Sequence, residues 1–312
     1  MEFIPETPYL KVPPDTLKVV REDIDMARPG EMKEAVRILD EWVHQQPHFI
    51  MKDIPPHYLE MTIVMSKGSL EKAKRVLENM YAARTDRPDY FEPADPYTYY
   101  ETFKDEACAT ALPKLTSEYY RVQVAKHKGR LTRKGLEALT KFSFSCLDYI
   151  KSRDYNCGIV VVFDIRALDL NAILRDIPML LDIKNAMLTF LNAYGMRLKR
   201  IHVISSSKLV HNIISFFKAH FSKKIFDRIM VHEQPQELLQ FYPKAILPQD
   251  FGGDEKSLDD LELVGHKPLS AESHLSHMRV MSACRLDPAL DPSRQLNEVD
   301  GVSGTFRTLN ID

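Results

Sequence analysis

The feature that most constrains the fold of this chain is a continuous β-branched run that follows Gly158. The run Ile159–Ile165 reads IVVVFDI, which is typical of a strand that is covered on both faces. The segments after it alternate in type: helical residues to about Tyr194, a strand over 199–204, a helix over 208–221 and a strand over 226–231. Two successive crossover units of this kind force neighbouring strands to be parallel. The sequence therefore predicts an α/β fold with a mainly parallel sheet.

The chain divides into four predicted parts. Residues 1–30 are polar and interrupted by proline, and they predict a flexible arm. Residues 31–96 carry apolar side chains at three- and four-residue spacings, which predicts a small all-helical unit. Residues 97–253 contain the strands and form the main domain. Residues 254–312 hold 11 acidic against 6 basic side chains, and they predict an acidic, largely extended tail.

Charge and composition exclude several classes of protein. The net charge of −2 divides into −5 for residues 254–312 and +3 for the rest, and nothing resembles the basic stripe of a nucleic-acid binder. No apolar run approaches the roughly 18–20 residues of a membrane span, and the N-terminus lacks a signal peptide. The four cysteines show no CxxC spacing, so neither a metal site nor a disulfide framework is expected. We expect a soluble cytoplasmic protein.

The common enzyme motifs are absent. GxGxxG, GxxxxGK[ST], GxSxG and HExxH do not occur, so the sequence predicts no enzymatic activity and no cofactor. Ser205–Ser207 follow a predicted strand, where backbone donors could hold an anion, but a serine helix cap explains them equally. A hydrolase that uses Ser206 or Ser207 remains an alternative, which a fluorophosphonate probe would test.

Two further patterns allow both an ordinary and a specific interpretation. The predicted helix 208–221 carries an apolar stripe, which fits a crossover helix packed on its sheet or a lid over a hydrophobic cavity. Basic residues stand at the start of two predicted strands, with Arg197, Lys199 and Arg200 at one and Arg228 at the next. A crossover places the starts of both strands at the same edge of the sheet. Such a group is either a solvated rim or a phosphate-binding site, since guanidinium groups match phosphate oxygens.

Together these stretches resemble the CRAL-TRIO family of lipid-binding proteins, which includes retinaldehyde-binding and α-tocopherol transfer proteins. The resemblance covers about residues 30–253. Within the family, the N-terminal helical unit resembles that of the insect-type members in particular. Its motifs are Tyr120-Arg121-Val122, the run from Gly158, the segment Arg197–Ile204 and the closing Leu247-Pro248-Gln249-Asp250-Phe251-Gly252-Gly253. The family usually places Asn and Pro where this chain has Ser205 and Ser207, which puts the behaviour of the lid hinge in question.

The resemblance implies a ligand cage, formed by the sheet and flanking helices, with a movable gate helix at about 208–221. It also implies phosphoinositide binding by four cations, which are Arg84, Arg197, Lys199 and Arg228. The expected ligand-binding residues are apolar apart from one polar anchor, and ordinary core packing competes as an explanation for each of them. They are Ser145, Ile159, Val161, Phe163, Phe190, Tyr194, Ile201, Val203, Val210, Ile213, Phe217 and Phe221.

The expected function is non-enzymatic binding of a hydrophobic small molecule, such as a retinoid, tocopherol, terpenoid or phospholipid, and its transfer between membranes. The expected partners are this ligand and an anionic membrane surface, which the protein meets transiently. The alternative function is a lipid-sensing regulatory module, in which the acidic tail recruits a protein partner and no lipid moves between vesicles.

Overall fold

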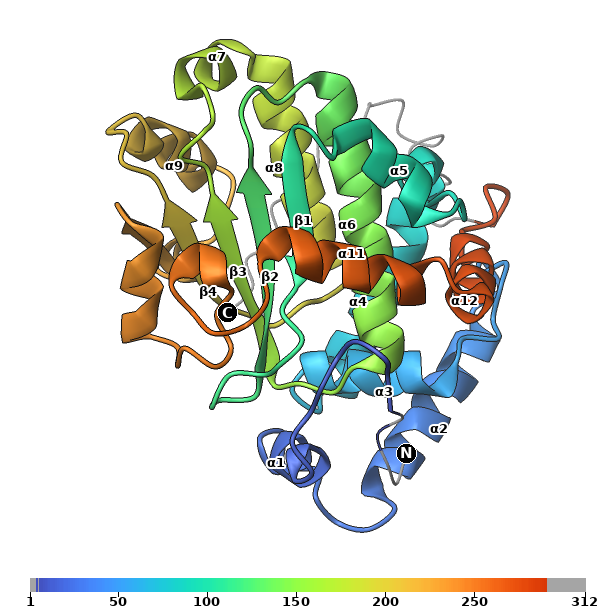
Figure 1. Cartoon of the computed structure of the whole chain (residues 1–312). Helices are drawn as coiled ribbons and strands as arrows, with labels where there is room; N and C mark the ends of the chain where they lie inside the picture. Colours follow the sequence, from blue (N-terminus) through green and yellow to red (C-terminus); the bar gives the residue numbers. More distant parts are fainter. Residues whose placement is uncertain (1–3, 5, 291–312) are drawn as a thin grey trace.

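The computed structural model describes residues 4 and 6–290, and its centre is a five-stranded sheet (Figure 1). The strands lie in the order β1-β2-β3-β4-β5. Their bounds are Ala107–Ala111, Tyr120–His127, Gly158–Asp164, Leu198–Ile204 and Ile229–His232. β1 pairs antiparallel with β2, and the other three pairings are parallel. The predicted α/β class with a mainly parallel sheet is confirmed.

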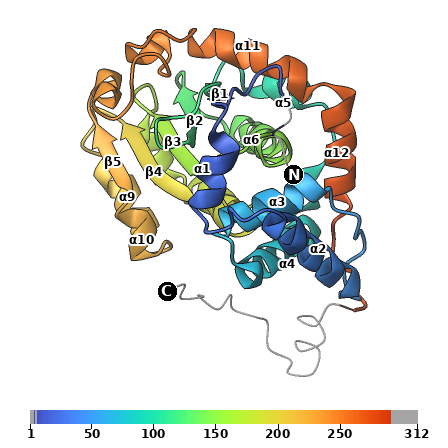
Figure 2. The ribbon, with the colours of Figure 1, turned by 90° about the horizontal axis from the view of Figure 1, so that it is seen from below.

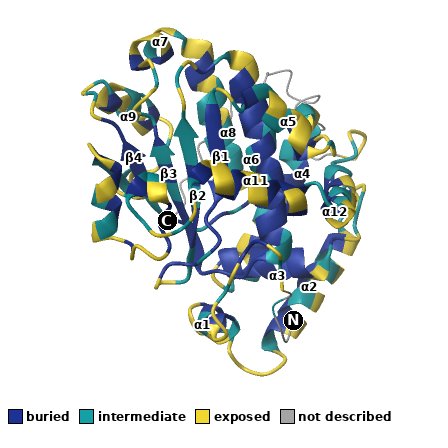
Figure 3. Cartoon of the chain, in the orientation of Figure 1, coloured by how far each residue is buried: buried dark blue, intermediate teal, exposed yellow. Residues whose placement is uncertain are grey.

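Helices cover the sheet and connect its strands. The connecting helices of the main domain are α6 (Arg133–Arg153), α7 (Leu170–Arg175), α8 (Ile177–Asn192), α9 (Val210–Lys218) and α10 (Lys223–Phe226). α6 runs through the middle of the molecule, between the sheet and the N-terminal helices (Figure 2). The strands and the sheet-facing side of α6 are largely buried, as Figure 3 shows.

The face of the sheet that is opposite to α6 is covered by the segment that follows β5. This segment contains two short 3-10 helices, η2 (Pro235–Gln240) and η3 (Gln249–Phe251). The Tyr242 hydroxyl lies 2.8 Å from His202 Nε2 on β4, and Tyr242, Leu247 and Phe251 are buried in the main core. Both faces of the central strands are thus covered, which explains why the sequence of β3 is apolar throughout.

The N-terminal part is helical, as predicted. Its helices are α1 (Thr16–Glu22), α2 (Glu31–Gln45), α3 (Pro56–Met65), α4 (Leu70–Asp86), η1 (Pro88–Phe91) and α5 (Pro96–Phe103). α3 is buried all round and packs on α2, α4 and α6. The helix is mainly apolar, and its buried carboxylate, Glu60, forms an ion pair with Arg21 of α1. In this way α3 joins the N-terminal helices to the main domain.

The N-terminal arm differs from its prediction. Residues 16–22 form helix α1, and Tyr9, Leu10 and Val20 are buried in the main core. Tyr9 also bonds through its hydroxyl to Thr110 on β1 at 2.8 Å. Proline and polar residues correctly indicated little regular structure before residue 16, but the few apolar side chains fix the arm to the domain.

The prediction of an extended tail is wrong for its described part. Residues 254–290 include α11 (Leu258–Leu269), which packs on β1, and α12 (Glu272–Ser282), which packs on α6. Leu258 and Leu261 are buried while the acidic side chains of the first turn stay exposed. The acidic composition concealed an amphipathic helix, and Pro268 inside α11 argued against one. Residues 291–312 of the predicted tail lie outside the described residues.

Across residues 4 and 6–290, no helix combines the length and apolar character that crossing a bilayer requires.

Candidate functional site

A cavity of about 310 Å³ lies between the sheet and helices α6, α8 and α9. Val161 and Phe163 on β3 pair in register with Ile201 and Val203 on β4, and all four line the cavity. Because alternate residues of a strand point to the same face, these side chains form one continuous apolar floor.

The roof of the cavity is the segment from α9 to α10. Val210, Ile213 and Phe217 on α9 and Phe221 after it all line the cavity. Phe217 belongs to one small hydrophobic cluster and Val210 to another, and both clusters are separate from the main core. A roof that packs mainly on its immediate neighbours can move without opening the main core.

Nine of the twelve expected ligand-binding residues line this cavity. They are Val161, Phe163, Phe190, Ile201, Val203, Val210, Ile213, Phe217 and Phe221. They come from β3, β4, α8 and the α9 region, so the structure brings together residues that are up to 60 positions apart in the sequence (161 to 221). That they bind a ligand stays a prediction.

Three expected residues do not line the cavity. Ser145 on α6 faces the C-terminal helix α12, where its Oγ lies 3.1 Å from His274 Nε2. The Tyr194 hydroxyl donates to the Phe144 carbonyl oxygen at 3.1 Å, inside the main core. Ile159 is fully buried in the same core. The sequence pattern identified these positions as buried but could not separate core from cavity, since both are apolar.

Sequence reasoning missed a large part of the lining. Many of the missed residues are apolar residues of α6 and α8, including Leu136, Leu139, Leu147, Leu180, Ile183, Met187 and Leu191. The amphipathic patterns of α6 and α8 were the sequence feature from which these residues could have been identified. Five polar residues were also missed, which are Thr110, Gln123, His127, Thr140 and Ser143. Gln123 and His127 are on the same face of β2, because they are four residues apart, and both line the cavity.

A second site is a basic cluster at the start of β4 and β5, which consists of Lys67, Arg197, Lys199 and Arg228. Repulsion by Arg197 is the main cause of a lowered pKa at Lys67. Burial first, and then Arg197, also lowers the pKa of Lys199 and of Arg228. Three of the four residues predicted to bind phosphoinositides therefore lie together, as a crossover between parallel strands requires.

Each predicted cation of this basic cluster also has a partner within the chain. Arg197 forms an ion pair with Asp23 at the end of α1. The Lys199 ammonium lies 4.5 Å from the centre of the Tyr120 ring, and Arg228 donates to the Leu198 carbonyl oxygen. These contacts hold the cations at the edge of the sheet.

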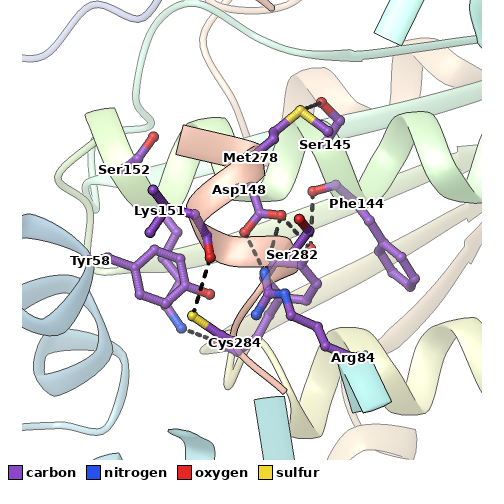
Figure 4. Close-up of polar contacts among 12 residues, drawn as sticks. Tyr58, Arg84, Phe144, Ser145, Asp148, Lys151, Ser152, Met278, Ser282 and Cys284 are labelled. Atoms are coloured by element: carbon purple, nitrogen blue, oxygen red, sulfur yellow. Dashed lines mark hydrogen bonds and ion pairs between the residues drawn. The ribbon is translucent and has the colours of Figure 1, made fainter. Parts of the chain in front are cut away.

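Arg84, the fourth predicted phosphoinositide ligand, does not join the basic cluster. It is 1% exposed, and its Nη2 lies 3.0 Å from Asp148 Oδ1 on α6 (Figure 4). Burial and the nearby Arg84 charge lower the pKa of Lys151, which is also fully enclosed, to about 7. An arginine that neutralises a buried aspartate is a structural residue, and the expectation that Arg84 faces a membrane is wrong.

Two family models match parts of this chain. Residues 116–253 match the family model of the CRAL/TRIO domain, which spans β2 to η3 and includes the cavity floor and roof. The chain contains a CRAL/TRIO lipid-binding domain. Residues 28–99 match the Pinta-like UBA domain, which corresponds to α2–α4 and the start of α5. A solved structure described as "Crystal structure of Sfh5" aligns with a TM-score of 0.49 at 11% identity, over 81% of this chain and 93% of that chain.

Ser205–Ser207 form the turn between β4 and α9, where the resemblance predicted the hinge of a gate. The Ser207 amide donates to Ser205 Oγ and the Leu209 amide donates to Ser207 Oγ, each at 3.3 Å. The Ser205 amide also donates to the His232 carbonyl oxygen at 2.8 Å. The serine hydroxyls therefore stabilise the turn that precedes α9. They do not form the expected helix cap, because the N-cap residue of α9 is Leu209, which makes no side-chain cap hydrogen bond.

Proposed function

We propose that this chain binds one hydrophobic small molecule in the cavity of its CRAL/TRIO domain and transfers it between membranes without catalysing a reaction. The observation that carries the proposal is the apolar cavity of about 310 Å³ beneath α9. This volume lies at the lower end of the range of roughly 300–1,000 Å³ for small-molecule sites. The proposal includes membership of this chain in the retinaldehyde-binding subfamily, in its insect-type form.

The gate explains how a ligand is retained in water. Opening α9 would expose Val210, Ile213, Phe217 and Phe221, which line the cavity. At roughly 1.5–3 kcal/mol per large apolar side chain, the cost is several kcal/mol, up to about 10. The gate therefore stays closed in water, and the ligand stays inside.

The basic cluster explains how a membrane would offset this cost. Lys67 and Lys224 are close enough for the Lys224 charge to lower the pKa of Lys67, after the larger effect of Arg197. Because Lys224 lies on α10, the basic cluster adjoins the gate. Cations near an anionic membrane contribute about 1 kcal/mol each, while the apolar roof inserts among acyl chains.

A transfer assay with a gate variant tests the proposal. Retinol, α-tocopherol and NBD-labelled phosphatidylcholine are each placed in donor vesicles, and their arrival in acceptor vesicles is followed by fluorescence. The wild-type protein should accelerate transfer of at least one probe. Phe217→Asp should abolish this acceleration, because it places a charge in the cavity lining.

Leu263→Asp is the matched control, since Leu263 is an exposed leucine of α11 outside the cavity. It should retain full transfer. The proposal fails if the wild-type protein moves none of the probes, or if the two variants transfer equally well.

A further inference from the structure

The segment 272–287, here called the C-terminal strap, connects two parts of the molecule. It begins with α12 and lies outside the ranges 28–99 and 116–253 that the family models match. α12 packs on α6 of the main domain and on η1 of the N-terminal part. After α12, Leu286 forms an isolated antiparallel bridge with Phe49, and its amide donates to Thr85 Oγ1 on α4 at 2.8 Å. The C-terminal strap therefore holds the N-terminal helices against the main domain.

The inner face of the C-terminal strap combines apolar side chains with two histidines. His274 Nε2 lies 3.1 Å from Ser145 Oγ on α6, which also lies 3.2 Å from the sulfur of Met278 (Figure 4). The ring centre of His277 lies 5.9 Å from that of Tyr58 on α3. One histidine thus contacts the main domain and the other contacts the N-terminal helices. The buried residues of the strap are His274, His277, Met278, Met281 and Cys284.

Each of the two imidazoles has a buried ring nitrogen that makes no hydrogen bond. These atoms are His274 Nδ1 and His277 Nε2, and neither has a partner in residues 4 and 6–290. A protonated imidazole carries an N–H group on both ring nitrogens. Protonation in the docked strap would therefore leave a buried donor unsatisfied, which is costly.

The charges around the two imidazoles do not compensate for this cost. Burial is the main cause that lowers the pKa of both histidines to about 4. Asp148 on α6 acts in the opposite direction, but it already pairs with Arg84 on α4 at 3.0 Å and accepts a hydrogen bond from the Tyr194 hydroxyl. Arg153 on α6 disfavours protonation of both histidines. The docked strap therefore holds two neutral histidines at physiological pH.

The groups contributed by α3 and the adjacent part of α6 do not favour a positive charge either. His57 on α3 disfavours protonation of His277, as Arg84 does. The ammonium of Lys151 on α6 lies 4.3 Å from the centre of the same Tyr58 ring that His277 contacts. A protonated His277 would thus join a site with more cationic than anionic groups.

We infer that the C-terminal strap is a pH-sensitive device, which leaves the N-terminal helices and the main domain when His274 and His277 become protonated. In water an unperturbed histidine protonates near pH 6.5. Because the docked strap resists protonation and the released strap accepts it, release takes up protons and becomes more favourable as the pH falls below about 6.5. This inference goes beyond the proposed function and does not depend on a ligand in the cavity.

The strap can open without the rest of the fold, because it is a peripheral element. Three apolar side chains, Met278, Met281 and Cys284, accompany the histidines in its buried face. The central strand β3 is instead paired on both sides, with β2 and β4. Elements with few buried apolar contacts open at a lower free energy than the central strands of a core.

Hydrogen exchange with mass spectrometry on the full chain measures release of the strap. Protection factors, which correct for the effect of pH on the intrinsic exchange rate, are compared for residues 272–287 and for β3 at pH 7.5 and pH 5.5. Protection of the strap should fall by about 100-fold, about ten-fold for each histidine. It should stay below the protection of β3 at both pH values.

Variants assign this change to the two histidines. In the double variant His274→Gln and His277→Gln, which keeps polar side chains that do not titrate, strap protection should change by about three-fold or less. His277→Gln alone should retain a change of about ten-fold, and it tests the inference even where the double variant does not fold. His211→Gln, at an exposed position of α9, should behave like the wild type.

Three results would overturn the inference. The first is a wild-type strap whose protection changes by less than about three-fold between the two pH values. The second is a change in His277→Gln or in the double variant as large as that of the wild type. The third is equal protection of the strap and β3 at each pH, which would show that the strap opens only when the whole protein unfolds.

Discussion

His202 is the central residue of a hydrogen-bonded chain on the sheet face opposite the cavity. Its Nδ1 lies 2.8 Å from His232 Nε2, and its Nε2 lies 2.8 Å from the Tyr242 hydroxyl. Burial, together with the neighbouring His232, lowers the pKa of His202 to about 3. A neutral His202 therefore helps to join β4, β5 and the segment that covers them.

This environment makes the stability of the protein depend on pH. The unfolded chain protonates this histidine near pH 6.5 and the folded chain only near pH 3, so stability is lost as the pH falls through this interval. At pH 5 the loss from this one group is of the order of 2 kcal/mol relative to pH 7.

His202→Gln keeps a donor and an acceptor but does not titrate. In urea unfolding, the drop in the free energy of unfolding between pH 7 and pH 5 should be smaller for this variant by about 2 kcal/mol. His211→Gln, at an exposed position of α9, should behave like the wild type. An equal drop in His202→Gln and wild type would refute the assignment.

At the residue scale, sequence patterns predicted burial better than they predicted role. Val161, Phe163, Ile201 and Val203 were expected to be ligand-binding residues and do line the cavity, whereas Ile159, on the same face of β3 by alternation, is buried in the main core. Arg84 was misassigned because a cation that neutralises a buried aspartate looks the same in a sequence as one at the surface. Its partner, Asp148, is 64 residues away and is brought near only by packing.

At the element scale, the predictions that held were those with a strong local pattern. The β-branched run became β3, and the apolar stripe over 208–221 became α9 and its continuation. The strand β1 and the helices α11 and α12 were missed. β1 is only five residues long, and α11 combines a proline with acidic residues, so its pattern is weak although its buried face fits the sheet edge.

A prediction about the basic cluster also belongs to the element scale, because the connection between β4 and β5 brings its residues together. Replacing Arg197 and Lys199 together by Ala should weaken sedimentation with phosphoinositide liposomes by roughly 30-fold, which corresponds to about 1 kcal/mol per cation. Lys33→Ala, at an exposed position of α2, serves as the control and should sediment like wild type. Unchanged sedimentation of the double variant would remove the cluster from membrane docking.

At the scale of the whole molecule, the sequence predicted a sheet with crossover helices but not the space inside it. Periodicity reports which side chains avoid water, and an apolar side chain avoids water equally well in a core or in a cavity. The cavity arises because α6, α8 and α9 are held away from the sheet by their own packing, which involves Leu136, Leu180 and Phe217 in a separate cluster. This spacing is a property of the assembled fold.

The most direct test of the account is native mass spectrometry of the full chain purified from cells, followed by incubation with a mixture of neutral lipids. The account predicts a complex that exceeds the 36.0 kDa chain by the mass of one small lipid and that releases it on collisional activation. A chain that shows only its own mass, both as purified and after incubation, would contradict the central claim that the cavity is a ligand site.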